Sequence, residues 1–119
     1  MTIRRFRLPR PPSSNNLYFN HSAGGRRPTK HHERWRREAM QLVMTQRKGG
    51  LPAIAGRYRL DIICERQGGA DLDNKIKAVS DLLVLMNVIV DDCLCEEIHV
   101  CWGDITGCEV TVEEICAIA

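Results

Sequence analysis

The alternation of apolar and charged residues between positions 53 and 66 constrains the fold more than any other feature of the sequence. Side chains of a β-strand point alternately to the two faces of a sheet. One parity of this segment is apolar, and the other parity is mainly charged. We therefore expect a strand with one buried face, whose inward residues are Ile54, Tyr58, Leu60, Ile62 and Cys64.

Two helical patterns flank this strand in the chain. Apolar residues recur at helical spacing over 31–47 and over 73–87; Thr29 can cap the first helix and Gly49-Gly50 can end it. The order of elements, β-α-β-α-β-β, indicates an α+β (mixed α/β) fold with a mixed sheet and two main helices. The other expected strands are 3–8 (an edge strand), 96–103 with Ile98, Val100 and Trp102 inward, and a last strand from Cys108.

The length of 119 residues suits a small single domain spanning 1–119. Within it, residues 20–30 contain Gly24-Gly25, Pro28 and several basic residues. Glycine and proline interrupt regular structure, so we expect a mobile basic loop over 20–30.

Opposite charges gather at the two ends of the chain, although the formal net charge is only +2. Residues 1–48 contain twelve Lys or Arg and two acidic residues, a balance of +10, whereas residues 78–119 contain nine acidic residues and no Lys or Arg. A basic surface suits a polyanion, and gathered carboxylates suit a site that needs them. The alternative interpretation is that the two charged regions neutralise each other across the fold.

The sequence also bears on location. No apolar run approaches the roughly 20 residues that span a bilayer, so no membrane association is expected. The basic start Met1–Arg5 is not followed by an apolar stretch, which argues against a signal peptide and for the cytoplasm. The six cysteines have no C-x-x-C spacing, so we expect reduced thiols that serve mainly as small apolar residues of strands.

Carboxylates cluster on either side of the second helix. Asp71 and Asp73 can converge if the helix is approached by an extended segment, because residues i and i+2 then point the same way. Lys77 follows Asp73 by four residues and lies on the same helix face. If Asp91-Asp92 return alongside them, the carboxylates repel unless a cation binds them. Carboxylate oxygens suit Mg²⁺, with Mn²⁺ as the alternative.

A purely structural interpretation accounts for the same residues. Asp71 or Asp73 would cap the helix, Lys77 would pair with Asp81 at i+4, and Asp91-Asp92 would form a turn. The D-x-D pair alone is a weak signal. The full pattern is more specific: it consists of D-x-D-N, a lysine four residues after the second aspartate, and a D-D pair beyond an apolar helix.

These motifs together resemble those of the RusA family of Holliday-junction resolvases, small homodimeric endonucleases common in phages and prophages. The stretch Leu8–Tyr18 is similar to the family's opening strand and its P-P-S-x-N-x-x-Y turn. Asp71–Asn74 with Lys77 is similar to its central motif, and Val90–Asp92 to its second acidic motif. The stretch Asn87–Val90 departs from the family's frequent glycine-aromatic turn.

The resemblance implies a hydrolase that resolves four-way DNA junctions by paired symmetric cuts in DNA recombination and repair. It implies Mg²⁺ as the cofactor (Mn²⁺ as the alternative), no organic cofactor and a bacterial or phage-encoded protein. Two cuts require two active sites related by a dyad, so we expect a homodimer. The implied metal ligands are Asp71, Asp73 and Asp92, the implied catalytic lysine is Lys77, and Asp91 matches a neighbouring acidic residue.

Contacts to DNA are expected in the basic N-terminal region. The candidates for contacting phosphate or stacking on an unpaired base are Asn15, Asn16 and Tyr18. The candidates for following the DNA backbone are Arg26, Arg27 and Lys30. An Asx-turn with a packed tyrosine, and a solvated loop, are the corresponding structural alternatives.

The sequence leaves two other classes of function open. One is a non-catalytic DNA-binding module that uses the basic region, and the other is an interaction protein that uses the acidic C-terminal third. Among the remaining residues we expect His31 and His32 to precede the first helix and be exposed, and His99 to point outward from its strand. We expect Trp35 and Trp102 to lie in the core or at a dimer contact.

Overall fold

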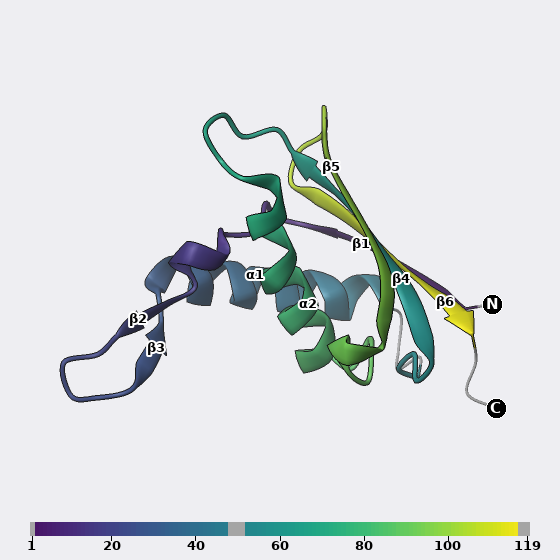
Figure 1. Ribbon diagram of the computed structural model, residues 1–119, viewed down its shortest axis with the longest axis horizontal. Helices are drawn as coiled ribbons and strands as arrows, with labels where there is room; N and C mark the ends of the chain where they lie inside the picture. The colour runs from purple at the N-terminus through teal and green to yellow at the C-terminus, as the bar shows by residue number, and fades with distance from the viewer. Residues whose placement is uncertain (1, 48–51, 117–119) are drawn as a thin grey trace.

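The computed structural model describes residues 2–47 and 52–116. Its main sheet has the strand order β1-β6-β4-β5 (Figure 1). β4 runs parallel to β5, whereas β6 runs antiparallel to both β1 and β4, so the sheet is mixed as expected. The strands are β1 (Ile3–Leu8), β4 (Arg57–Glu65), β5 (Cys95–Gly103) and β6 (Cys108–Cys116).

Two helices, α1 (Lys30–Gln46) and α2 (Ile76–Leu85), lie on the same side of this sheet (Figure 1). α2 joins the parallel strands β4 and β5, a connection that needs a crossover of this kind. The Thr29 side chain caps α1 by accepting the His32 N–H at 3.1 Å. The α+β class and both helices are therefore confirmed, while the expected Gly49-Gly50 stop lies outside the described residues.

A second, two-stranded sheet replaces the expected loop over 20–30. β2 (Tyr18–Asn20) pairs antiparallel with β3 (Arg26–Pro28), and this hairpin projects away from the main sheet (Figure 1). Gly24 and Gly25 have positive φ values, which glycine adopts without steric cost and which allow the chain to reverse at the tip. Three short 3₁₀ helices complete the fold: η1 (Ser14–Asn16), η2 (Leu72–Lys75) and η3 (Asp92–Leu94).

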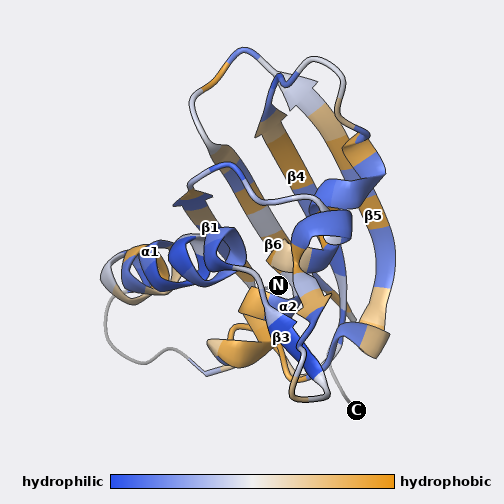
Figure 2. Ribbon diagram, turned by 90° about the vertical axis from the view of Figure 1, so that its left-hand side faces the viewer, coloured by the Kyte–Doolittle hydropathy of each residue, from blue (hydrophilic) through white to orange (hydrophobic). Residues whose placement is uncertain are grey.

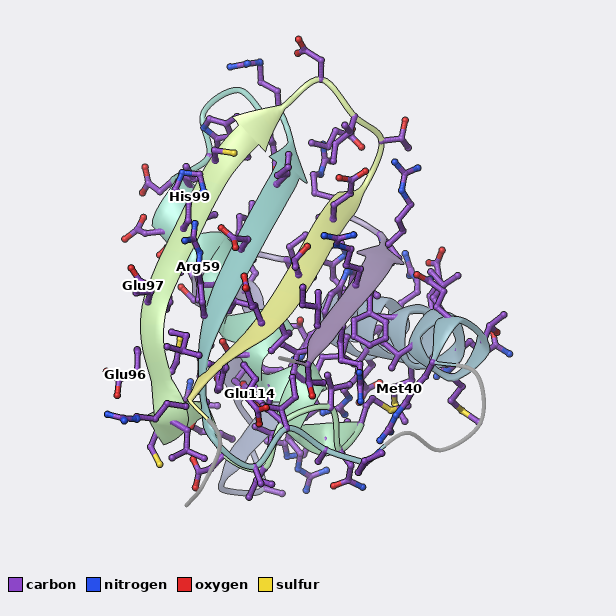
Figure 3. All side chains as sticks on the ribbon, turned by 90° about the vertical axis from the view of Figure 1, so that its right-hand side faces the viewer. Met40, Arg59, Glu96, Glu97, His99 and Glu114 are labelled. Carbon is purple, nitrogen blue, oxygen red and sulfur yellow. The ribbon has the colours of Figure 1, made fainter. Side chains whose placement is uncertain are left out.

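The core lies between the helices and one face of the sheet. Tyr58, Leu60, Ile62 and Cys64 of β4 are buried, as their shared parity predicts, and α2 contributes Val79 and Leu83. Figure 2 shows that α2 is the more hydrophobic of the two helices. The opposite face of the sheet is open and polar; Arg59, Glu97 and His99 stand on it (Figure 3). The outward position of His99 is confirmed.

The two edges of the main sheet differ in their protection. On β1, the Gln46 side chain accepts the Arg7 N–H at 2.7 Å and donates to the Arg7 carbonyl at 2.8 Å, so a side chain of α1 occupies the place of a neighbouring strand. On β5, Ile98 pairs in register with the inward Leu60, yet it is 48% exposed. An edge strand has a neighbour on one side only, which explains why this inward residue is incompletely covered.

The expectation of an exposed His32 is wrong. His32 lies in the first turn of α1 and is 2% exposed, and its Nδ1 lies 3.1 Å from the carbonyl oxygen of Leu17. His31 is exposed, as expected. Trp35 is in the core, with its indole N–H bonded to the Pro9 carbonyl at 2.9 Å. Histidine can enter the core here because a backbone carbonyl satisfies its ring nitrogen.

Within the described ranges, no helix is both long and apolar enough to cross a membrane. The cysteines Cys64, Cys93, Cys95, Cys101 and Cys108 are free thiols. Cys64 and Cys108 are fully buried in neighbouring strands, which confirms that they serve as small apolar residues.

Tyr58 provides a test of this core. Its hydroxyl is buried beside the Cys95 thiol, a weak hydrogen-bonding group, and makes no hydrogen bond of good geometry within the described ranges; burial raises the pKa of that hydroxyl. An unpaired buried polar group costs roughly 1–3 kcal/mol. Tyr58→Phe should therefore raise the free energy of unfolding by about 1 kcal/mol in urea denaturation, whereas Leu60→Ala should lower it by about 3 kcal/mol. A loss of stability in Tyr58→Phe would show that the hydroxyl has a partner.

Candidate functional site

Two of the candidate segments meet although they are far apart in the sequence. We call residues 11–16 the N-terminal turn and residues 71–75 the acidic turn. The Ser14 hydroxyl of the first donates to Asn74 Oδ1 of the second at 3.0 Å. Asn74 is thus a positioning residue of the acidic turn in this structure. The contact fixes the N-terminal turn beside the start of α2, against which η1 also packs.

A buried lysine strengthens the same contact. Lys75 is 3% exposed, and its Nζ donates to the Pro11 carbonyl at 3.1 Å and to Gln67 Oε1 at 2.7 Å. Because burial disfavours the charged form, it lowers the pKa of Lys75. Sequence reasoning missed this residue, since nothing in its position between Asn74 and Ile76 distinguishes it from a solvent-facing lysine.

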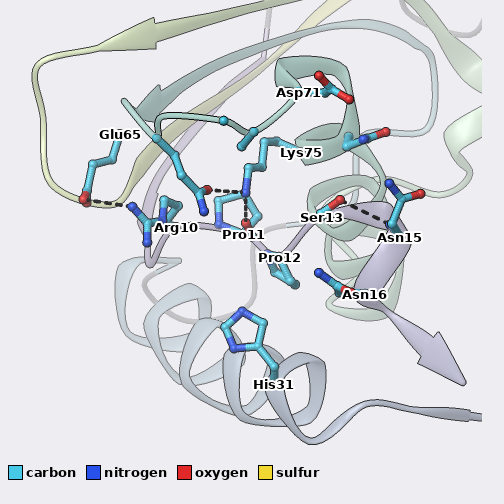
Figure 4. A pocket seen from close by; sticks show the side chains of 14 residues that line it. Arg10, Pro11, Pro12, Ser13, Asn15, Asn16, His31, Glu65, Asp71 and Lys75 are labelled. Carbon is cyan, nitrogen blue, oxygen red and sulfur yellow. Dashed lines mark hydrogen bonds and ion pairs between the residues drawn. The ribbon is translucent and has the colours of Figure 1, made fainter.

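A pocket of about 510 Å³ opens between the two turns (Figure 4). Its volume is in the range of small-ligand sites, about 300–1,000 Å³. Donor groups and the carboxylates of Asp71 and Glu65 face it together, Glu65 being paired with Arg10 at 3.3 Å, which suits a ligand that has both acceptors and donors. The residues that give it this character are Arg10, Asn15, Asn16, His31, Glu65, Asp71 and Lys75.

The acidic turn presents two exposed carboxylates. Asp71 has an extended backbone (φ −88°, ψ 126°), as expected for the approach to the helix, and its side chain makes no capping hydrogen bond. Asp73 lies in the first turn of η2 and is also exposed. Asp71 thus occupies the N-cap position of η2, as the structural interpretation has it, but its carboxylate, at the rim of the pocket (Figure 4), makes no capping hydrogen bond.

The second acidic segment divides into two roles. The Asp91 carboxylate accepts the backbone N–H of Cys93 at 3.0 Å and caps η3, and this hydrogen bond lowers the pKa of Asp91. Asp91 therefore has a structural role at this turn. Asp92 is exposed, and η3, to which it belongs, packs against α2.

Lys77 lies between acidic partners. Its Nζ donates to Asp81 Oδ1 at 3.1 Å, the i,i+4 pair that the structural interpretation predicts. This hydrogen bond is the main cause that raises the pKa of Lys77, and the charges of Asp81 and Asp92 and the proximity of Tyr18 raise it further. The Lys77 ammonium therefore stays protonated at neutral pH and is close enough to Asp92 to feel its charge.

The donor chemistry fits a hard divalent cation, but the geometry of a metal cluster is not formed. Carboxylate oxygens suit Mg²⁺ and Mn²⁺. Among residues 2–47 and 52–116, no three His, Cys, Asp or Glu side chains lie close enough together to hold a metal ion. The expected convergence of Asp71, Asp73 and Asp92 is therefore absent from this structure. Asp71 and Asp73 precede α2, whereas Asp92 follows it.

The candidate DNA-contacting residues fall into two groups. Asn15 and Asn16 are exposed at the pocket. The remaining candidates lie on or next to the hairpin, where Tyr18 is half-buried and the basic residues Arg26, Arg27 and Lys30 are exposed. The structure thus places all these candidates along one continuous stretch of chain, which runs from the pocket to the hairpin and into α1.

Comparison with known proteins adds no assignment. No family model matches the chain, and no curated protein matches it either. The function must therefore be inferred from the fold, the motifs and the contacts between them.

The pairing of Lys77 with Asp81 can be tested by titration. Asp81→Asn removes the carboxylate that contributes most to the raised pKa, so the pKa of Lys77 should fall toward the ordinary lysine value. The measurement is an NMR titration of the lysine side-chain signals. Asp104→Asn is the matched control, because Asp104 is exposed and lies beside Arg66 instead. An unchanged Lys77 pKa in Asp81→Asn would contradict the pairing.

Proposed function

We propose that the protein is a metal-dependent, structure-selective endodeoxyribonuclease that resolves four-way DNA junctions in recombination and repair. The observation that carries the proposal is the contact between the N-terminal turn and the acidic turn through Ser14–Asn74 and Lys75–Pro11. These are the segments that resemble resolvase motifs; Lys77 lies in the first turn of the helix that follows the acidic turn, and the charge of Asp92 acts on it. A lysine next to available carboxylates, within a basic region, suits phosphodiester hydrolysis.

Each residue has a role in this proposal. Asp71, Asp73 and Asp92, which do not converge in this structure, would have to come together to hold Mg²⁺ or Mn²⁺, which when bound supplies a Lewis acid and a water of lowered pKa. Lys77, held protonated by Asp81, would donate to the phosphate oxygens as negative charge develops on them. Asp91 would fix the shape of η3 so that Asp92 faces α2. No organic cofactor is required.

The basic N-terminal region would bind the DNA backbone. Arg26 and Arg27 are exposed on the projecting hairpin (Figure 1), and Lys30 is exposed at the start of α1, where they could contact phosphates. Paired symmetric cuts require two sites related by a dyad, so the active form would be a homodimer. Its substrate places the enzyme in the cytoplasm of a bacterium or of a phage-infected cell.

A non-catalytic DNA-binding module is the second candidate. The observation that favours it is the absence of a metal-holding group of side chains within the described ranges. This candidate predicts junction binding without cleavage in Mg²⁺ or Mn²⁺. Cleavage of a synthetic four-way junction therefore separates the two candidates.

Asp73→Asn is the sharpest variant for that assay. It removes an exposed carboxylate from the acidic turn while keeping the shape of the side chain. The rate of junction cleavage should fall by more than about 100-fold, because even residues that only support metal ligands contribute 10–100-fold. The dissociation constant for the junction should stay the same or decrease, since a negative charge near phosphate is lost.

Asp104→Asn serves as the charge-matched control and should cleave normally. Dimers that combine one wild-type and one Asp73→Asn subunit should nick one strand only, which is the signature of paired sites. Cleavage at the wild-type rate by Asp73→Asn would overturn the assignment of the metal site.

The basic hairpin gives a second measurement. Replacing both Arg26 and Arg27 with alanine should raise the dissociation constant for DNA and flatten its dependence on salt. Each phosphate contact contributes about 0.9 to the slope of log K against log salt, so the slope should fall by about 2. An unchanged slope would remove the hairpin from the DNA interface.

A further inference from the structure

The two aromatic residues of β2 have different surroundings. The Tyr18 ring meets the buried His32 ring edge-on, with centroids 5.4 Å apart, and the Arg26 guanidinium lies 5.1 Å from its centroid. Tyr18 also lines a small recess with Ala78 and Asp81 of α2. Its ring is therefore already engaged by the protein, which leaves little of it for a stacking partner.

Phe19 is the exposed aromatic residue of the hairpin. Successive side chains of a strand point to opposite faces, so Phe19 points away from the face on which Tyr18 contacts His32. It is 46% exposed, and the nearest ring to it is that of His21, tilted by 48° at 6.1 Å. Arg27 is its partner in register on β3. A large apolar side chain thus lies among cationic and polar neighbours, where no core requires it.

The base of the hairpin is firmly fixed. Thr29 donates its backbone N–H to the Leu17 carbonyl at 2.9 Å and its hydroxyl to the Asn16 carbonyl at 2.6 Å. The buried His32 lies at hydrogen-bond distance from the same Leu17 carbonyl. At the tip, the His21 N–H donates to the Gly25 carbonyl at 2.9 Å. Phe19 is therefore presented on a braced element that projects from the body of the protein (Figure 1).

We propose that Phe19 is a stacking residue for an unpaired nucleobase of DNA, with Arg27, its partner in register, on a flanking phosphate. The proposal rests on the DNA-binding part of the proposed function. An exposed ring beside an arginine suits the flat face of a base that is joined to a phosphate. An apolar protein partner would instead require further apolar residues around Phe19, and its neighbours Asn20, His21 and Arg27 are polar or charged.

The experiment uses 2-aminopurine, a fluorescent base that is quenched when it stacks. It is placed at the centre of a four-way junction and, separately, in a single-stranded oligonucleotide. The full-length protein should quench it, and Phe19→Ala should remove the quenching and raise the dissociation constant about tenfold, as loss of one base–aromatic stack does. Affinity for fully paired duplex should be unchanged in this variant.

Two further variants make the result specific. Phe19→Trp should restore both quenching and affinity, because indole stacks at least as well as phenyl. Met44→Ala removes another exposed apolar side chain, 67% exposed on α1, and should behave as wild type. Circular dichroism confirms that each variant is folded.

The outcomes separate this inference from the proposed nuclease activity. Quenching that depends on Phe19, without cleavage by the wild type, supports the stacking residue and overturns the nuclease. Cleavage by the wild type with identical quenching and affinity in Phe19→Ala overturns the stacking residue and leaves the nuclease. Failure of the wild type to bind any of the oligonucleotides overturns the stacking proposal as well.

Discussion

The buried ammonium group of Lys75 is the interaction on which the arrangement of the site depends. A lysine at 3% exposure loses nearly all of its hydration, which is costly unless hydrogen bonds replace it. Its two acceptors come from different parts of the chain, the Pro11 carbonyl in the N-terminal turn and Gln67 in the loop after β4. The hydrogen bonds of this one amine therefore hold the acidic turn, the N-terminal turn and the loop after β4 together. The pocket lies between the two turns in this arrangement.

The charges of the molecule separate into those already paired and those left available. β1 lies beside β6, so the basic start of the chain meets its acidic end, and Arg7 pairs with Glu109 on the open face. The interpretation that the basic and acidic regions neutralise each other is therefore correct for the contact between β1 and β6. The exposed carboxylates of Asp71, Asp73 and Asp92 lie around α2 instead, and the arginines of the hairpin lie far from the acidic strands (Figure 1). Net charge therefore understates both the acidic and the basic character of the candidate site.

The sequence predicted the elements whose periodicity follows from burial. The parity of Tyr58, Leu60 and Ile62 identified the inward face of β4, because a strand in a half-covered sheet must alternate. The buried positions of Lys75 and His32 could not be predicted, since each is stabilised by a carbonyl that is distant in sequence. The hairpin was missed for a related reason: its strands have three residues each, too few to show a period, and contacts to Thr29 stabilise them. The convergence of the carboxylates is absent from the described residues, because it depends on how η3 packs against α2, which residue spacing does not determine.

Continuity of the chain links the pocket to the hairpin. Asn15 and Asn16 line the pocket, and Phe19 follows Asn15 by only four residues. Four residues span at most about 14 Å even when fully extended. Leu17, the buried residue between them, is held by Thr29 and by His32, so the two functional ends of this segment cannot move independently. In the proposed nuclease, a base stacked on Phe19 would therefore lie a short and fixed distance from Asn15 at the pocket. The same buried histidine that sequence reasoning placed in solvent would then set the register between the stacked base and the pocket.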